Sequence, residues 1–407
     1  MFLRESESTR EVILTGASAL RAIRKARIGK EFALVPCEKH SISPCNPHDL
    51  PGEVLTFIRG FESGGKVHIR VPHKAKRFKS QGFVLHETPI DLPDHAFYRL
   101  VPTGGSRYSL ASAIGTTMGG PGGSSSITIY VDMPTLVLPW LAYQLQRHMN
   151  TGKLTYNQVL MRTAALAMEF CGCYSLEPDG MGCGKGMYFL APLLSKEQLC
   201  SMLENARKTK GIVIARKAAR LAADNAASPP EALMYLLLSA SIRRGGLGYP
   251  DVRLNEPVDP EELRQGNATH RRLTPDLYLA GLHVAFDFHG RFAHEVYCDD
   301  EIDAVVEEMF GDDGRRDQYR EDIVRLQDLL LAHISVFPVT MEDLANSLKF
   351  AELALKFSVA IDRWCAGTKR ANESGRVSLL VAKADWQRTA NEIINAFQPH
   401  RWARGIV

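Results

Sequence analysis

The sequence of 407 residues has little that would place it in a membrane or an oxidising compartment. Its longest apolar stretches, such as Ala232–Ala240, are about half of the roughly 18–20 residues that span a bilayer. Met1–Arg10 is charged rather than apolar, so we expect no secretory signal. Eight cysteines are too few for a disulfide scaffold, and reduced thiols are expected. These features predict a cytoplasmic protein that has no membrane span.

A large excess of either charge is also lacking, since 49 basic residues stand against 46 acidic ones. A net charge of +3 excludes no partner, because nucleic-acid-binding domains are recognised by clustered charge. Residues 21–30, 66–79 and 207–220 are basic and contain no acid, whereas 295–322 holds twelve carboxylates against three arginines. The near-neutral sum therefore combines opposite local charges.

Apolar residues make up 45% of the chain and charged residues 23%, as in ordinary folded proteins. The length predicts more than one unit. We expect a multidomain protein of the α/β and α+β classes. Its predicted parts are a basic α+β region at 1–131, a mostly helical region at 132–226, an α/β domain at 227–345 and a helical tail at 346–407.

Two patterns resemble ligand-binding motifs but do not match them. The segment Gly180–Gly186 has a glycine after Lys185, where a Walker A phosphate loop needs Ser or Thr, so we interpret it as a turn. Four cysteines lie close together in sequence, but their gaps match no common zinc spacing, which favours structural or buried thiols over zinc. They are Cys171, Cys173, Cys183 and Cys200.

Periodicity predicts the elements of the first two regions. A helix is expected over Thr15–Arg27, where Thr15 or Ser18 could cap it. Alternation predicts a strand at Val67–Val71, and short strands are expected at Phe83–His86 and Ile127–Val131. The middle region predicts helices at 133–148, 155–170, 195–208 and 212–226.

The third region begins with Ser228, which can cap a helix continuing through Ser241. Leu277–Leu279 and Val284–Phe288 flank a turn and predict a β-hairpin. Helical periodicity at 316–333 then precedes a strand at Ile334–Val339. This order predicts a small sheet covered by helices.

Acidic residues recur at the ends of these elements. Glu231 lies on the first helix, Asp276 begins one strand of the hairpin, and Asp287 lies near the end of the other. A hairpin brings such strand ends together, and converging carboxylates suit Mg²⁺ or Mn²⁺. His289 or His294 could orient a water, act as a general base or shield the leaving oxygen, with Glu231 also in a catalytic role. Taken singly, each acid also fits a structural role, at a turn, a helix start or an ion pair.

The spacing of this region resembles the PD-(D/E)XK nuclease superfamily, and more specifically the restriction-endonuclease-like domain related to very short patch repair endonucleases. The resemblance implies a metal-dependent nuclease fold. Three positions depart from the family pattern: Asp287 replaces the usual glutamate, His289 replaces the usual acid or lysine, and His294 matches the nearby family histidine only approximately. The segments that carry the resemblance are Ser228–Glu231, Pro275–Leu277, Val284–Gly290, Asp322 with Arg325, and His333–Leu344.

The first half is similar to proteins in which such a domain follows an abortive-infection antitoxin-like region. Thr15–Arg27 resembles their "S-A-L" helix, and His68–Val71 with Gly82–His86 resembles their hairpin. Ile127–Leu145 and Cys171–Tyr174 also fit. The resemblance implies DNA binding and a protein partner in a defence or toxin–antitoxin system.

Two hypotheses follow from the sequence. The first is a magnesium-dependent endodeoxyribonuclease, and the second is a catalytically inactive DNA-binding regulator or antitoxin-like interaction protein. Both use basic segments for phosphate contacts, although cations on a short helix often form a solvated face. His68, His73 and His86 are expected at the surface rather than on a metal. The predicted DNA-contacting residues are Arg21, Arg24, Lys25, Arg27, Lys74, Lys76 and Arg77.

Overall fold

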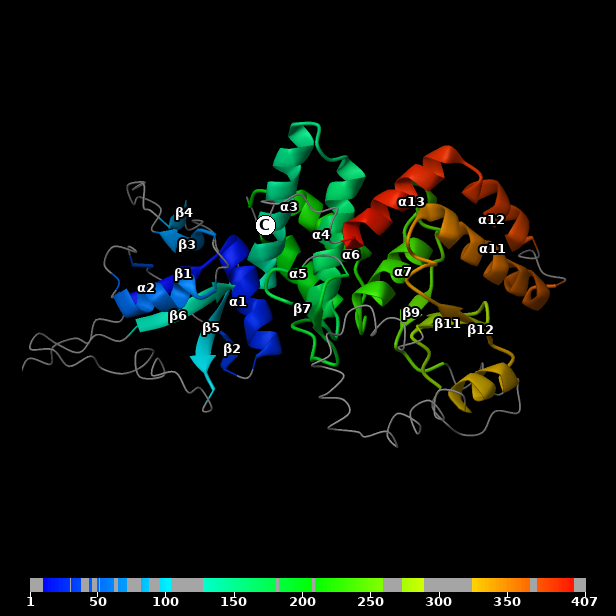
Figure 1. Cartoon of the computed structure of the whole chain (residues 1–407), viewed down its shortest axis with the longest axis horizontal. Coiled ribbons are helices and arrows are strands. Elements are labelled where there is room, and N and C mark those ends of the chain that lie inside the picture. Colours follow the sequence, from blue (N-terminus) through cyan, green and yellow to red (C-terminus); the bar gives the residue numbers. More distant parts are fainter. Residues whose placement is uncertain are drawn as a thin grey trace, which may run out of the picture.

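The protein combines helices with two larger β-sheets in a mixed α/β arrangement. The computed structural model describes residues 10–29, 31–37, 44–45, 50, 52–61, 65–71, 82–87, 96–103, 127–180, 183–206, 209–258, 273–288, 324–366 and 372–398. A six-stranded sheet lies at one end of the molecule, helices lie in the middle, and a four-stranded sheet with the tail lies at the other end (Figure 1). No helix among the described residues is long and apolar enough to cross a bilayer.

The first sheet has the strand order β2-β5-β6-β1-β3-β4. Its centre is the parallel pair β1 and β6, aligned from Arg10 opposite Ile127 to Leu14 opposite Val131. Helix α1 (Gly16–Ile28) follows β1 directly and packs against β3 and β6. The predicted helix and strands of this region are confirmed. The bounds are β1 Arg10–Leu14, β2 Phe32–Pro36, α2 Gly52–Arg59, β3 Val67–Val71, β4 Phe83–Glu87, β5 Phe97–Pro102 and β6 Ile127–Asp132.

Strands β3 and β4 pair in parallel, so the predicted hairpin is wrong. Val67 lies opposite Phe83 and Val71 lies opposite Glu87, which gives both strands the same direction. A short turn can join only antiparallel strands, whereas parallel neighbours need a longer crossover. The motif was located correctly, but its pattern of residues carries no information about strand direction.

The middle of the molecule is a group of packed helices, as predicted. Helix α4 is almost wholly buried and contacts α3, α6 and α13. Capping boxes begin α4 and α5, where the side chains of Thr155 and Ser195 accept hydrogen bonds from the backbone N–H groups of Gln158 and Gln198. The bounds are α3 Pro134–Asn150, α4 Tyr156–Cys171, β7 Ser175–Leu176, β8 Gly186–Met187, α5 Lys196–Asn205, α6 Ile212–Leu221 and α13 Ala384–Phe397.

The second sheet has the order β12-β11-β10-β9 and confirms the predicted hairpin of β10 and β11. Strand β9 was missed because it has only three residues, and the sequence there was interpreted as turns. Helix 324–331 separates β11 from β12, which allows these two strands to pair in parallel. The bounds are α7 Pro229–Ser239, β9 Val252–Leu254, β10 Leu277–Leu279, β11 Val284–Phe288 and β12 Ser335–Val339.

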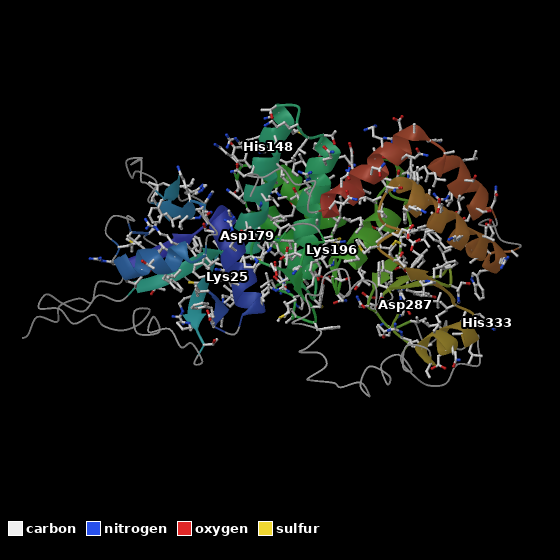
Figure 2. The ribbon with its side chains drawn as sticks, viewed as in Figure 1. Lys25, His148, Asp179, Lys196, Asp287 and His333 are labelled. Atoms are coloured by element: carbon white, nitrogen blue, oxygen red, sulfur yellow. The ribbon has the colours of Figure 1, made fainter. Side chains whose placement is uncertain are left out.

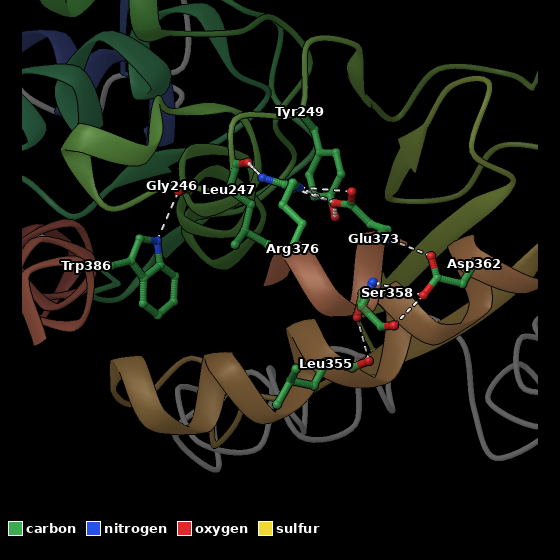
Figure 3. A network of polar contacts seen from close by, with 10 residues as sticks. Gly246, Leu247, Tyr249, Leu355, Ser358, Asp362, Glu373, Arg376 and Trp386 are labelled. Atoms are coloured by element: carbon green, nitrogen blue, oxygen red, sulfur yellow. Dashed lines mark hydrogen bonds and ion pairs between the residues drawn. The ribbon is translucent and has the colours of Figure 1, made fainter. Parts of the chain in front are cut away.

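The helical tail is fixed to the segment that follows α7. Helices α11 (Ser347–Trp364), α12 (Glu373–Val381) and α13 form it. The hydroxyl of Tyr249 donates to Glu373, Arg376 donates to the carbonyl of Leu247, and the indole of Trp386 donates to the carbonyl of Gly246 (Figure 3). The largest apolar core contains residues from the first sheet, the middle helices, the second sheet and the tail.

Candidate functional site

Two of the predicted acids meet at one end of the second sheet. The β10–β11 register pairs Leu277 with Phe286, so Asp276 and Asp287 lie opposite each other at the next position. The backbone N–H of Asp276 donates to Asp287 Oδ1 at 3.2 Å, and the N–H of Phe288 donates to Asp276 Oδ2 at 2.7 Å. These bonds hold both carboxylates against the hairpin backbone, and Figure 2 shows the position of Asp287.

Glu231 is the third acid, and α7 presents it from the neighbouring element. Its side chain is 6% exposed. One carboxylate oxygen accepts from the Ser228 hydroxyl at 2.7 Å, and the other accepts from the N–H of Ala227 at 2.9 Å. The hydroxyl of Ser228 in turn accepts from the N–H of Glu231, so the predicted helix cap is confirmed. Local capping chemistry thus fixes this carboxylate.

Asn255 joins Glu231 to Asp276 and was not identified from the sequence. Its side-chain amide donates to Glu231 Oε2 at 2.6 Å, and its backbone N–H donates to the carbonyl of Asp276 at 3.0 Å. The residue has a φ of 50°, in the left-handed region that asparagine tolerates better than most residues. Asparagine directly after β9 was the available signal, but the strand was too short to detect.

Burial and neighbouring acids disfavour the charged form of Asp276. Burial, followed by the nearby carboxylates of Glu231 and Asp287, raises the pKa of Asp276 to about 7. The N–H of Phe288 and the guanidinium of Arg325 oppose this rise. Burial also raises the pKa of Glu231, although hydrogen bonds from Ser228, Ala227 and Asn255 oppose it. The site therefore holds more negative charge than its surroundings neutralise.

Arg325 supplies a positive charge at this site. Its Nη2 lies 3.2 Å from Asp287 Oδ2, and the Asp287 side chain is 7% exposed. The arginine comes from helix 324–331, the region in which the family pattern places its late "D-x-x-R" helix. Asp322, the other residue of that motif, lies outside the described residues.

Asp276 and Asp287 are the two predicted metal ligands that lie together on the β10–β11 hairpin. Within the described ranges, no three His, Cys, Asp or Glu side chains are arranged to hold a metal together. Magnesium in proteins is commonly bound by one or two carboxylates, with waters and substrate phosphates completing its shell. The carboxylate of Glu231 already accepts three hydrogen bonds, so its role as a metal ligand stays a prediction. His289 and His294 lie outside the described residues.

The cations of α1 that were predicted to bind DNA instead form hydrogen bonds and ion pairs within the protein. Arg24 is 2% exposed and forms a bidentate pair with Glu169 at 2.7 and 2.8 Å. Arg27 donates to the carbonyls of Glu169, Gly172 and Ala191, Arg21 pairs with Asp179, and Lys25 donates to the carbonyl of Gly60. This placement gives no support to phosphate binding by α1. Lys74, Lys76 and Arg77 lie outside the described residues.

The cysteines and the histidines considered as metal ligands are placed as follows. Burial raises the pKa of Cys171 and Cys183 to about 12, and none of the four clustered cysteines forms a disulfide.

His68 and His86 are half-buried rather than at the surface, and Nδ1 of His68 lies 3.0 Å from Nε2 of His86. Burial lowers the pKa of both imidazoles to about 4. His73 lies outside the described residues.

No known protein identifies this site, so its interpretation rests on its own residues. The resemblance to the nuclease superfamily, which rests on Ser228–Glu231, Pro275–Leu277, Val284–Gly290, Asp322 with Arg325 and His333–Leu344, stays a prediction. Searches with models of protein families, among curated proteins and among solved structures found no match to this chain.

Proposed function

We propose that the chain is a nuclease-fold protein that hydrolyses phosphodiester bonds in DNA with Mg²⁺ or Mn²⁺ held by Asp276 and Asp287. The observation that carries the proposal is the buried acid cluster, in which burial and then the neighbouring carboxylates of Glu231 and Asp287 raise the pKa of Asp276 to about 7. Burying like charges together costs stability, and such arrangements are concentrated at functional sites. A divalent cation would neutralise the excess charge.

The order of elements supports the same proposal. Helix α7 is followed by the antiparallel strands β9, β10 and β11, then by helix 324–331 and by β12 parallel to β11. The acids lie on the first helix and on the central hairpin, as in the nuclease superfamily that the sequence resembles. The fold alone does not establish activity, because one fold serves many functions.

Each described residue has a distinct role in this mechanism. A bound Mg²⁺ would lower the pKa of a coordinated water and stabilise charge on the transferring phosphoryl group. Asp276 and Asp287 would bind the ion from a rigid hairpin, which fixes their spacing. Glu231 would adjust the charge of the cluster through Asp276, and Asn255 would hold the two in register. His289 and His294 are proposed to orient the water or protect the leaving oxygen.

Cleavage of plasmid and single-stranded DNA tests the proposal directly. We expect Mg²⁺- or Mn²⁺-dependent nicking that falls at least about 100-fold in Asp276→Asn and Asp287→Asn, because a ligand carboxylate is lost. Asp251→Asn is the matched control, since Asp251 is an acid of the same unit whose side chain is 54% exposed. Absence of divalent-dependent cleavage on every DNA substrate would sink the proposal.

A second function, a DNA-binding regulator that keeps the nuclease fold without catalysis, is favoured by a specific observation. Three donors occupy Glu231, and Arg325 already neutralises part of the charge on Asp287. Such a protein would act in a defence or toxin–antitoxin setting together with a protein partner. It predicts salt-dependent DNA binding that survives Asp276→Asn and disappears when Lys74, Lys76 and Arg77 are changed to glutamine. Binding that ignores both salt and these cations would exclude it.

A further inference from the structure

Helix α6 exposes a row of cations on the side away from the core. Its inner face is formed by Ile214, Ala215, Ala218 and Ala219, all buried. Lys217 and Arg220 of α6 are exposed, and so is Lys210, which lies two residues before the helix begins. Val213, which is 61% exposed, lies between Lys210 and Lys217 in the sequence. The described cations Lys210, Lys217 and Arg220 therefore face outward, unlike those of α1.

The helices that pack against α6 extend this positive face. Between Asp132 and Glu169 the sequence contains no acid, and between Glu204 and Asp224 it again contains none. Helix α6 contacts both α3 and α4, so the two acid-free segments lie side by side. Arg147 and Lys153 are exposed in the first of them, and His148 marks the outer end of α3 in Figure 2.

Aromatic rings hold two of the lysines in place. The Nζ of Lys210 lies 5.3 Å from the centre of the Tyr143 ring, and the Nζ of Lys217 lies 5.4 Å from that of Tyr156. Lys217 also donates to the Tyr156 hydroxyl at 3.0 Å. A tyrosine ring attracts an ammonium group but carries no net charge. These lysines are therefore positioned while their full positive charge stays available to an anion.

Carboxylates neutralise less of this face than of α1. Glu204 pairs with Arg220 at 2.7 Å and lies 3.6 Å from Arg216. Arg216 also donates to the carbonyls at the end of α5, so it serves the fold. Lys153, Lys210 and Lys217 are exposed on this face, and none of the ion pairs recorded among the described residues involves them.

We propose that the face formed by α3, the start of α4 and α6 binds the phosphate backbone of nucleic acid. Charge complementarity selects this occupant, since phosphates spaced along a strand can contact Arg147 of α3, Lys153 of the following turn, and the cations of and just before α6. Tyr156, which is 41% exposed, adds an aromatic surface beside them. The inference rests on the proposed function for its substrate class, but binding at this face requires no cleavage and no metal.

Fluorescence anisotropy with labelled single-stranded and duplex DNA tests the full chain. We expect the variant with Lys153→Gln, Lys210→Gln and Lys217→Gln to bind at least about tenfold more weakly near 100 mM salt. The slope of log affinity against log salt should become shallower by about 2. Tyr156→Leu should weaken binding about two- to threefold, while Tyr156→Phe keeps the ring and should bind like the wild type.

A matched variant controls for net charge. Lys349→Gln, Lys356→Gln and Lys383→Gln remove the same charge from the tail and should leave the affinity unchanged. Equal losses in the two triple variants, or no loss in either, would overturn the inference. Displacement of DNA by poly-L-glutamate at equal charge concentration would also overturn it, in favour of an acidic protein. The triple variant at Lys153, Lys210 and Lys217 should bind Mn²⁺ at the acid site like the wild type, which separates failure of this face from failure of the acid site.

Discussion

The two sheets bury charge in opposite ways. In the first sheet Arg70 donates twice to the carboxylate of Asp132, to which the hydroxyl of Thr15 also donates, so the buried acid has a full counter-charge. In the second sheet one cation, Arg325, pairs with Asp287 and also acts on the neighbouring Asp276, so two acids share a single counter-charge. The balanced cluster stabilises the fold, whereas the unbalanced cluster costs stability, and we interpret it as functional for that reason.

The largest expected effect tests the balanced cluster. Asp132→Ala should destabilise the protein by about 3–5 kcal/mol, because it leaves Arg70 buried without its partner. Urea unfolding measures this change. Asp179→Ala is the control, since it removes a carboxylate that is 48% exposed from the pair with Arg21 and should cost about 1 kcal/mol or less. Equal costs for both variants would contradict the comparison.

Removing an acid from the unbalanced cluster is expected to raise the stability of the protein rather than lower it. The folded-state pKa of Asp276, about 7, lies above its ordinary value of 3.8, so the stability of its protonated form is lost as pH rises through about 7. The wild type should therefore lose stability between pH 5 and pH 8, whereas Asp276→Asn should not. The free energy of unfolding of the variant, relative to that of the wild type, should rise by about 1–3 kcal/mol over this interval. Unfolding measured at both values checks this. A variant that is less stable than the wild type at pH 8 would show that Asp276 is structural.

A smaller effect should sharpen the role of the counter-charge. Arg325→Met removes the cation that pairs with Asp287, the proposed metal ligand. The variant should therefore bind Mn²⁺ about three- to tenfold more tightly. Titration followed by electron paramagnetic resonance measures this affinity without relying on cleavage. Arg325→Lys keeps the charge and should bind Mn²⁺ like the wild type. Weaker binding in Arg325→Met would instead mean that Arg325 orients Asp287.

The smallest expected effect concerns the histidine pair of the first sheet. The folded-state pKa values of His68 and His86, about 4, lie below the ordinary 6.5, so their contribution is complete above pH 6.5 and is lost as pH falls toward 4. His86→Gln should reduce the loss of stability between pH 7 and pH 4.5 by about 1 kcal/mol. Urea midpoints at the two pH values would reveal an unchanged loss if the pair does not contribute.

Local patterns predicted which elements carry the three acids. They did not predict which charged side chains pair with residues far away in the sequence. Helix capping and hairpin periodicity placed Glu231, Asp276 and Asp287 correctly, because each signal lies within a few residues. The pairing of Arg24 with Glu169 spans 145 positions, and no local pattern encodes it. For the same reason Thr15 was expected to cap α1, whereas its hydroxyl donates to Asp132, 117 positions away.

The attachment of the tail has a consequence for the order in which the protein matures. Helix α13 packs against α4 and α7, and the indole of Trp386 bonds to Gly246, more than a hundred residues earlier. A ribosome adds these residues after the acids of the second sheet have been made. The hairpin that carries Asp276 and Asp287 can therefore form during synthesis, but its supporting helices close around it only once α13 has left the exit tunnel. A nascent chain that lacks α13 therefore also lacks the contacts by which α13 packs against α4 and α7.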